Sequence, residues 1–259
     1  MMTGALVTAV VSGHTQGLGA AVAAELMTRG IAVLGLARGT APELAARFGP
    51  LLREHQADLA DSAALAAWLA TPALRDFLGA SPRVLLINNA GMVEPVGALH
   101  DQDPLAVAQA VALNVAAPMM LATAVAAAAR QADCRILHVS SGAARNAYTG
   151  WSVYGATKAA LDHHARAVAL DYPLEPQARD AGAGVRICSL APGVIDTAMQ
   201  ARIRATSESR FPQRERFIAL QRDGALSSPE QCAAGVADYL LAPGFGRDVV
   251  DDLRASQRP

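Results

Sequence analysis

Residues 12–21 read "SGHTQGLGAA" and directly follow the apolar run "ALVTAVV". Gly13, Gly17 and Gly19 form the pattern GxxxGxG between an expected strand and an expected helix. This spacing lets the backbone turn sharply and approach a pyrophosphate at the positive end of the helix. A glycine-rich turn can also serve close packing alone. Its place in the first strand–helix unit, with another strand after one helix, favours the phosphate.

Short apolar runs alternate with longer Ala-rich segments, which is typical of βα repeats around a parallel sheet. The expected strands are Leu6–Val11, Ile31–Ala37, Val84–Asn88, Arg135–Ser140 and Val185–Leu190. The expected helices are Leu18–Arg29, Ser62–Ala70, Pro104–Gln131 and Ser152–Asp171, with a last helix that starts at Ser228 and Pro229. No linker or low-complexity tract interrupts them. The sequence therefore predicts one α/β domain over residues 1–259, with a doubly wound parallel sheet in a three-layer, Rossmann-type arrangement.

The interval 198–225 is polar, Arg-rich and long, and we expect an irregular flap over a site at the carboxyl edge of the sheet. The C-terminal stretch "GFGRDVVDDLR" suggests only a short last strand.

Composition narrows the function. The 259 residues carry a net charge of -1, which leaves no basic footprint for nucleic acid or an anionic membrane and favours a small-molecule partner. Cys134, Cys188 and Cys232 are widely spaced without a CxxC pair, so we interpret them as reduced packing residues. We expect no cleavable signal and no apolar run of the roughly 18 residues that a membrane span needs, hence a cytoplasmic protein.

A second motif is "WSVYGATKAAL", in which Tyr154 and Lys158 are four residues apart on an expected helix and share one face. A phenol with a pKa of about 10 is a poor acid at neutral pH, but a nearby cation lowers that pKa. Alone, such a pair is more often a surface tyrosine beside a solvated lysine. Other motifs must decide between these two interpretations.

Several motifs in order and spacing resemble the short-chain dehydrogenase/reductase family, in its single-domain type, over essentially the whole chain. They are "SGHTQGLG", the NNAG of residues 88–91, Asn114 in "ALNVAAP", Ser141 in "HVSSGAA" thirteen residues before Tyr154, and Pro192 with Gly193 in "LAPGVIDT". The stretches "PGVIDTAMQ", "RIRA" and "GALSSPE" resemble the branch of reductases that act on sepiapterin or benzil.

The resemblance implies a catalytic set. Tyr154 would protonate a carbonyl oxygen, and Ser141 would hydrogen-bond the same oxygen. Lys158 would lower the pKa of Tyr154 and bind the nicotinamide ribose, while the backbone of Asn114 would hold a water that links Lys158 to solvent. The thirteen-residue spacing favours Ser141 over Ser140, which we expect to be a packing residue at a strand end.

The resemblance also implies a nicotinamide cofactor. Besides Tyr154 and Lys158, the expected cofactor contacts are Gly13, Thr15, Gln16, Gly17, Leu18, Gly19, Arg38, Asp58, Leu59, Asn89, Ala90, Gly91, Pro192, Gly193, Ile195 and Thr197. Asp58 would bind the adenine amino group, Asn88 and Gly91 the adenosine ribose, and Ile195 and Thr197 the carboxamide. Alternatively, Asp58 caps the following helix and Thr197 is a loop hydroxyl satisfied locally.

The end of the second strand, "GLARGT", favours NADP(H) over NAD(H). Ala37 stands where an NAD site usually has a carboxylate, and Arg38 could face a 2′-phosphate with two parallel hydrogen bonds, with Thr40 adding a hydroxyl. Arg38 could instead be a solvated loop charge. Gln16 stands where NADP-preferring members often have a cation, which weakens the expected clamp.

The remaining conspicuous residues are weaker candidates. His163 and His164 point about 100° apart without a ligand cluster, so we expect packing or a subunit contact and no metal site. Candidate substrate walls, with ordinary loop packing as the alternative, are Glu94, Trp151, Met199, Phe211 and Phe217.

The expected activity is NADP-dependent reduction of a ketone or diketone to an alcohol by a homodimer or homotetramer. The alternatives are an NADP-binding sensor or scaffold without chemistry, and an NAD-dependent alcohol dehydrogenase of the same fold. A nucleotide-sugar epimerase or dehydratase would need a longer chain and a GxxGxxG spacing. An intact set of four catalytic residues argues against a pure binder.

Overall fold

The computed structural model describes residues 7–173 and 183–256. Its seven strands form one parallel sheet in the order β3-β2-β1-β4-β5-β6-β7. The strands are β1 (Val7–Ser12), β2 (Ala32–Ala37), β3 (Leu52–Gln56), β4 (Arg83–Asn88), β5 (Asp133–Val139), β6 (Gly184–Ala191) and β7 (Val250–Asp252). The strand order reverses between β1 and β4, the position at which such sheets bind ligands. The predicted doubly wound fold is confirmed.

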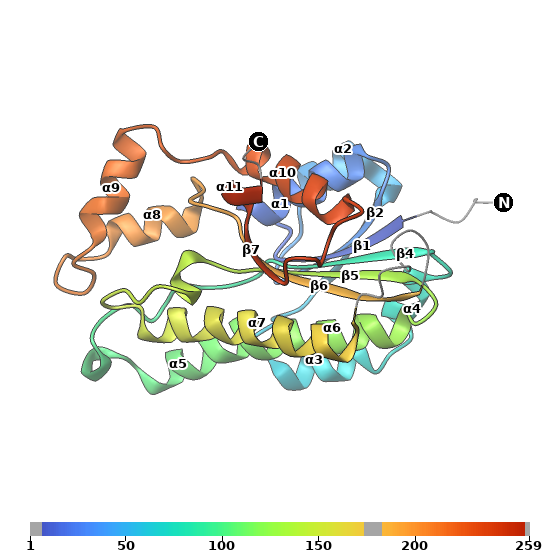
Figure 1. Ribbon diagram of the computed structural model, residues 1–259, viewed down its shortest axis with the longest axis horizontal. Coiled ribbons are helices and arrows are strands. Elements are labelled where there is room, and N and C mark those ends of the chain that lie inside the picture. Colours follow the sequence, from blue (N-terminus) through green and yellow to red (C-terminus); the bar gives the residue numbers. More distant parts are fainter. Residues whose placement is uncertain (1–6, 174–182, 257–259) are drawn as a thin grey trace.

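Helices cover both faces of the sheet (Figure 1). One face carries α1 (Gly17–Thr28), α2 (Pro42–Phe48), α10 (Pro229–Leu241) and the short α11 (Leu253–Ser256). The other carries α3 (Ser62–Leu69), α4 (Ala73–Leu78), α5 (Pro104–Val111), α6 (Ala117–Ala128) and α7 (Ser152–Asp171). A hydrophobic cluster fills each interface. Because both faces are covered, the central strands are apolar almost throughout, which is why their sequences are continuous apolar runs.

The sequence prediction missed some elements and misplaced others. Strand β3 reads "LREHQ", has little apolar character and lies at the edge of the sheet, where polar residues are tolerated. The helices α2 and α4 are short and were also missed. Leu6, the expected first residue of β1, lies outside the described residues. The C-terminal strand β7 is three residues long, in agreement with the expected short last strand.

The expected helix Pro104–Gln131 is two α-helices joined by a π-helical turn, Ala112–Ala116, and it ends at Ala128. The expectation that no apolar stretch could span a membrane is wrong by length and composition, because the helical run Pro104–Ala128 is long and apolar enough. Its second half packs against β4 and β5 inside a hydrophobic cluster. That is the position of a core helix.

The interval 198–225, which we call the flap, is more regular than expected and contains α8 (Ala198–Ala205) and α9 (Arg214–Arg222). These helices lie beyond the carboxyl edge of the sheet (Figure 1). Three apolar flap residues, Ile203, Phe211 and Phe217, are buried in a third cluster, whereas most of the charged side chains face solvent. The sequence prediction treated this interval as irregular because its many arginines make it polar overall, although its few apolar residues lie on the buried side of the helices.

Candidate functional site

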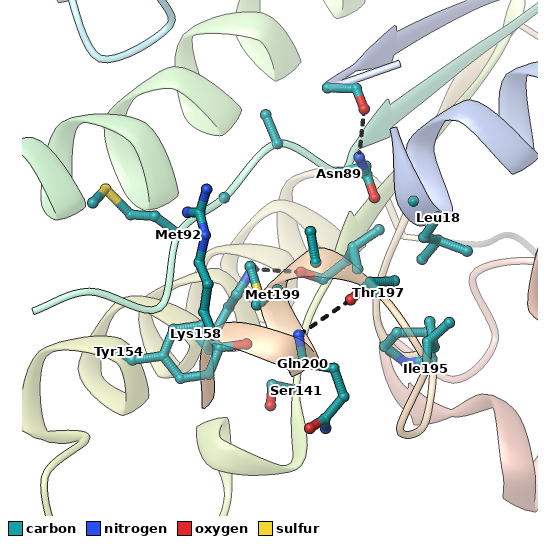
Figure 2. Close-up of a pocket in the computed structure, with 18 of the residues that line it drawn as sticks. Leu18, Asn89, Met92, Ser141, Tyr154, Lys158, Ile195, Thr197, Met199 and Gln200 are labelled. Atoms are coloured by element: carbon teal, nitrogen blue, oxygen red, sulfur yellow. Dashed lines mark hydrogen bonds between the residues drawn. The ribbon is translucent and has the colours of Figure 1, made fainter. Parts of the chain in front are cut away.

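A cavity of about 810 Å³ lies at the carboxyl edge of the sheet, between the loops that follow the strands and the flap. Of the residues expected to contact the cofactor, Gly19, Thr40 and Asn88 do not line the cavity, and all the others do. In Figure 2, Tyr154, Lys158 and Ser141 lie on one side of the cavity, and Leu18, Asn89 and Ile195 on the other. The fold therefore brings the glycine loop and the predicted catalytic residues, which are far apart in sequence, to one site.

The glycine loop is shaped by close backbone approach. Gly13 and Gly17 have φ values of 72° and 54°, in the left-handed region that favours glycine. A Cβ on Gly19 would lie 2.1 Å from the carbonyl oxygen of Gly13. The side-chain amide of Asn89 donates to the carbonyl oxygens of Ser12 and Gly13, at 3.0 and 3.2 Å. The loop is thus fixed against the end of β4 and leaves a backbone cradle of the kind that holds a pyrophosphate.

We expect Gly19→Ala to lower the free energy of unfolding by about 1–3 kcal/mol, because the added methyl would force the backbone of Gly13 to move. The matched control is Gly39→Ala, where an added Cβ meets nothing within 4 Å and the expected change is below about 0.5 kcal/mol. Denaturant unfolding of both variants measures this difference. Equal stability would contradict the close approach between Gly13 and Gly19.

Helix α7 positions Tyr154 and Lys158, both of which are almost fully buried. The Lys158 ammonium donates to the carbonyl oxygen of Val139 at 2.8 Å and lies 5.9 Å from the centroid of the Tyr154 ring. Burial raises the pKa of Tyr154, and a hydrogen bond with Ser141 opposes that rise. Burial also lowers the pKa of Lys158 to about 8. The direction for the pKa of Tyr154 differs from the sequence expectation, because burial outweighs the hydrogen bond with Ser141.

Asn114 lies in the π-helical turn and does not line the cavity. Its side chain accepts a hydrogen bond from the Met92 amide at 2.9 Å and donates to Met92 O at 2.8 Å and to Thr157 Oγ1 at 3.1 Å. A Cβ built on Gly91 would lie 3.2 Å from Asn114 Oδ1 and 3.6 Å from Lys158 Nζ. Asn114 and Lys158 therefore approach each other beside Gly91. The water expected on the Asn114 backbone stays a prediction.

The structure bears on the roles expected for Asn88 and Asp58. Asn88 is buried outside the cavity and donates to the carbonyl oxygen of Pro118 at 3.2 Å, so it is not placed along a ribose. Asp58 lines the cavity and accepts from the Ala60 amide at 3.0 Å. The helix after Asp58 is capped by Asp61, and not by Asp58 as the alternative interpretation held.

Thr197 caps α8 by accepting from the Gln200 amide at 3.4 Å while it also lines the cavity (Figure 2). Both expectations for Thr197 therefore hold for its position: its hydroxyl is hydrogen-bonded locally, and the residue lines the cavity.

At the other end of the cavity, Arg38 is exposed and lines the wall beside the buried Ala37. Gln16 also lines the wall, directly before α1. Thr40 does not line the cavity, so the hydroxyl expected to join Arg38 is absent from the wall.

Aromatic and apolar side chains surround the catalytic end. Of the predicted walls, Glu94, Trp151, Met199 and Phe217 line the cavity. Phe211 does not, because it is completely buried behind Trp151, with the two rings stacked at 4.7 Å and 14°. Its prediction as a wall is wrong. The prediction did not name Met92, Tyr148, Ile203, Leu220 and Arg254, which also line the cavity. Ile203 and Leu220 belong to the flap that was expected to cover the site.

His164 pairs with His138 and not with its sequence neighbour His163. The nitrogen atoms His138 Nε2 and His164 Nδ1 lie 3.1 Å apart, and burial lowers the pKa of His138 to about 3, which leaves that ring neutral at pH 7. His163, the helix residue directly before His164, is exposed. Over residues 7–173 and 183–256, no group of three His, Cys, Asp or Glu side chains could hold a metal ion. All three cysteines are free and buried, and burial raises the pKa of each thiol.

Comparison with known proteins gives consistent results. A family model described as short chain dehydrogenase matches residues 7–208. The benzil reductase ((S)-benzoin forming) of Bacillus cereus is 32% identical over 249 residues, which cover 91% of this chain and 94% of that protein. The sepiapterin reductase of Xenopus tropicalis is 30% identical over 262 residues, with 94% and 95% covered. A crystal structure of a short-chain dehydrogenase/reductase from Burkholderia vietnamiensis shares 49% identity, covers 98% of each chain and has a TM-score of 0.67.

Proposed function

We propose, from the premise that this chain belongs to the short-chain dehydrogenase family, that it is an NADP-dependent reductase that converts a ketone or diketone into an alcohol. The observation that carries the proposal is the cavity itself. One end holds Ser141, Tyr154 and Lys158, and the other holds the glycine cradle and Arg38. A dinucleotide bound across the point where the strand order reverses would therefore have its nicotinamide end beside Tyr154.

The cradle fits a dinucleotide. The left-handed glycines Gly13 and Gly17 and the close approach at Gly19 leave room for a pyrophosphate against the start of α1. Arg38 would bind a 2′-phosphate, and Ile195 and Thr197 would hold the carboxamide. Bound NADPH would supply the hydride for the carbonyl carbon.

Tyr154 would supply the proton. Because burial raises its pKa, its phenol is protonated at neutral pH, which is the form needed to donate to the carbonyl oxygen. Ser141 would donate a hydrogen bond to the same oxygen and thereby hold it beside the phenol. The Lys158 ammonium would carry the proton that replaces the one lost by Tyr154, and Asn114 would connect Lys158 to solvent.

The substrate is proposed to be an apolar or aromatic carbonyl compound. Trp151, Met199 and Phe217 supply an apolar wall beside Tyr154, and relatives with about 30% identity are named for the reduction of benzil, an aromatic diketone. A panel of ketones and diketones, benzil included, tests this by the loss of NADPH absorbance. Turnover of at least one aromatic diketone is expected. If NADPH binds but no member of the panel oxidises it, the rival function of a sensor or scaffold is favoured.

We further infer a single domain over residues 1–259 that works in the cytoplasm as a homodimer or homotetramer, without a nucleic-acid or membrane partner. A sheet that carries every described strand supports the single domain, and the net charge of -1 supports the small-molecule partner.

The flap is proposed to be a mobile lid. It lies over the cavity, and outside one aromatic cluster in which Phe211 and Phe217 pack on Trp151, most of its side chains are exposed, as is typical of segments that open locally. Hydrogen exchange of backbone amides in residues 198–225 is expected to slow when NADPH and a substrate analogue bind. The amides of β4, in the centre of the sheet, serve as the internal reference. Equal exchange of the flap in free and bound protein would contradict the lid.

A further inference from the structure

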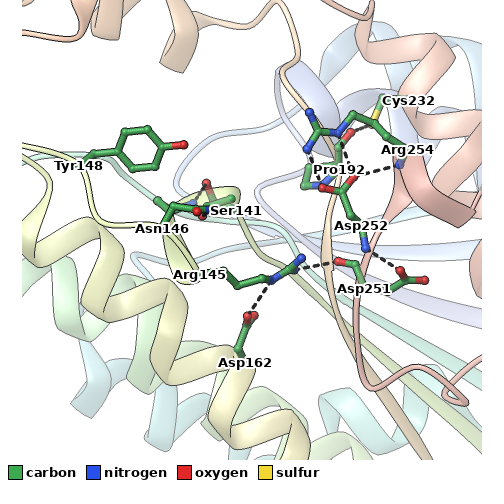
Figure 3. A network of polar contacts seen from close by, with 12 residues as sticks. Ser141, Arg145, Asn146, Tyr148, Asp162, Pro192, Cys232, Asp251, Asp252 and Arg254 are labelled. Atoms are coloured by element: carbon green, nitrogen blue, oxygen red, sulfur yellow. Dashed lines mark hydrogen bonds and ion pairs between the residues drawn. The ribbon is translucent and has the colours of Figure 1, made fainter.

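A buried carboxylate lies behind the catalytic end of the cavity. Asp162 follows Lys158 by one helical turn on α7 and is 2% exposed. Its Oδ1 accepts hydrogen bonds from the hydroxyls of Ser140 and Ser189, each at 2.7 Å. Its Oδ2 accepts a hydrogen bond from Arg145 Nε at 3.3 Å (Figure 3). A buried carboxylate is costly unless it is paired and hydrogen-bonded, and these three donors satisfy both conditions.

Each donor comes from a different segment next to the site. Ser140 directly precedes Ser141 at the end of β5, and both residues line the cavity. Ser189 belongs to β6, the strand that leads to the Pro192–Gly193 turn. Arg145 also donates, through Nη2, to the carbonyl oxygen of Asp251 in β7 at 2.8 Å (Figure 3). The carboxylate therefore connects α7 with the carboxyl ends of three strands. Ser140 was expected to be a packing residue at the strand end. Its hydroxyl instead donates a hydrogen bond to this carboxylate.

We propose that Asp162 is a positioning residue of the site, whose carboxylate fixes the strand end that carries Ser141 to the helix that carries Tyr154 and Lys158. The proposal deepens the proposed function and rests on it for the roles of Ser141 and Tyr154. Ser141 and Tyr154 must address one carbonyl oxygen, and they belong to different segments. The bond between Asp162 and Ser140, together with the bond from Lys158 to the carbonyl oxygen of Val139, sets the distance between these segments.

The charge of Asp162 has a second effect. Burial lowers the pKa of Lys158 to about 8, and the negative charge of Asp162 acts in the opposite direction. Around these two groups, the described titratable or charged neighbours include Tyr154 on the same helix, His138 on β5, Cys188 on β6 and Arg145, which faces the carboxylate. Removing the carboxylate charge leaves burial unopposed. The pKa of Lys158 is then expected to fall, so the ammonium loses its proton at a lower pH.

Two serine variants test the positioning. Ser140→Ala and Ser189→Ala each remove one 2.7 Å hydrogen bond to the same oxygen, but only Ser140 is attached to Ser141. Loss of a hydrogen bond to a charged group is large enough to displace Ser141, so Ser140→Ala is expected to lower kcat by at least about fivefold. Ser189→Ala is expected to lower kcat by less than about twofold, because Ser189 is not attached to Ser141. The two variants should lose similar thermal stability. Equal losses of kcat would overturn the positioning role and leave a structural one.

The charge effect can be measured without turnover, because Lys158 is the only lysine among the 259 residues. Protein labelled with ¹³C at lysine Cε gives one lysine signal, whose pH titration reports this amine directly. The midpoint is expected near 8 in the unaltered protein, and at least about half a pH unit lower in Asp162→Asn. Ser189→Ala should keep the midpoint of the unaltered protein. An unchanged midpoint in Asp162→Asn would overturn the charge effect.

The outcomes separate this inference from the proposed function. Should the protein reduce no carbonyl compound, the proposed function fails, while the lysine titration still decides the link between Asp162 and Lys158. Should Asp162→Asn not fold, the two serine variants, which keep the carboxylate, still decide the positioning role.

Discussion

Replacing Tyr154 by Phe is expected to lower kcat for carbonyl reduction by about 10²- to 10⁴-fold, the range that general acid catalysis supplies. The phenol is the proposed proton donor, and its pKa is raised by burial, so the protonated form dominates at neutral pH. Phenylalanine keeps the ring, which packs edge-on against Trp151 at 5.3 Å, and removes only the hydroxyl. The fold should therefore be preserved while the proton is lost.

Binding measurements distinguish this loss from damage to the site. Fluorescence titration with NADPH should give nearly the same Kd for Tyr154→Phe as for the unaltered enzyme. Lys158→Ala should differ, because Lys158 is also expected to contact the nicotinamide ribose, and its Kd should rise. If Tyr154→Phe retains more than about a third of kcat, the role of Tyr154 as the proton donor is refuted.

The second large effect concerns the choice of cofactor. We expect kcat/KM to be higher with NADPH than with NADH, because Arg38 lines the end of the cavity that is proposed to hold the adenosine, and Ala37 leaves no carboxylate to repel a 2′-phosphate. Hydrogen bonds to a charged group contribute about 1.5–3 kcal/mol, which corresponds to roughly 10- to 150-fold in affinity. Gln16 adds no second cation, and Thr40 does not line the cavity, so the lower half of that range is expected.

The double variant Ala37→Asp with Arg38→Leu tests this directly. It introduces the carboxylate typical of NAD sites and removes the guanidinium, so the ratio of kcat/KM values should shift towards NADH by at least about tenfold. The single variant Arg38→Lys is the matched control, because it keeps the charge and loses the two parallel hydrogen bonds. A preference for NADH in the unaltered enzyme, or an unchanged ratio in the double variant, would rule out the role of Arg38.

The sequence was most informative where backbone chemistry leaves a local pattern. The turn at Gly13, Gly17 and Gly19 needs the absence of side chains, and the central strands are continuous apolar runs because helices cover both faces. That Tyr154 and Lys158 share one helix face follows from helical periodicity, and the other motifs were needed to predict their catalytic role. Such features are visible without knowledge of the tertiary contacts.

Features that depend on tertiary contact were not visible. Strand β3 is polar because it lies at the sheet edge, and the flap helices bury only a few apolar residues. Asn88 and Asn89 are adjacent, yet one donates into the core and the other to the glycine loop, since successive strand residues point to opposite faces. Asp162 resembles any helix carboxylate in the sequence. Its three donors come from residues 140, 145 and 189 and meet it only in the folded protein.

The central claim is that this protein uses NADPH to reduce a carbonyl group. The most direct test incubates the enzyme with an aromatic diketone and with NADPH that carries deuterium at both hydrogen positions of nicotinamide C4, and locates the label in the product by NMR. We expect an alcohol with deuterium on the carbon that was the carbonyl carbon, formed by the unaltered enzyme and at most at about a hundredth of that rate by Tyr154→Phe. An alcohol without deuterium at that carbon, or no alcohol from any carbonyl compound while NADPH binds, would contradict it.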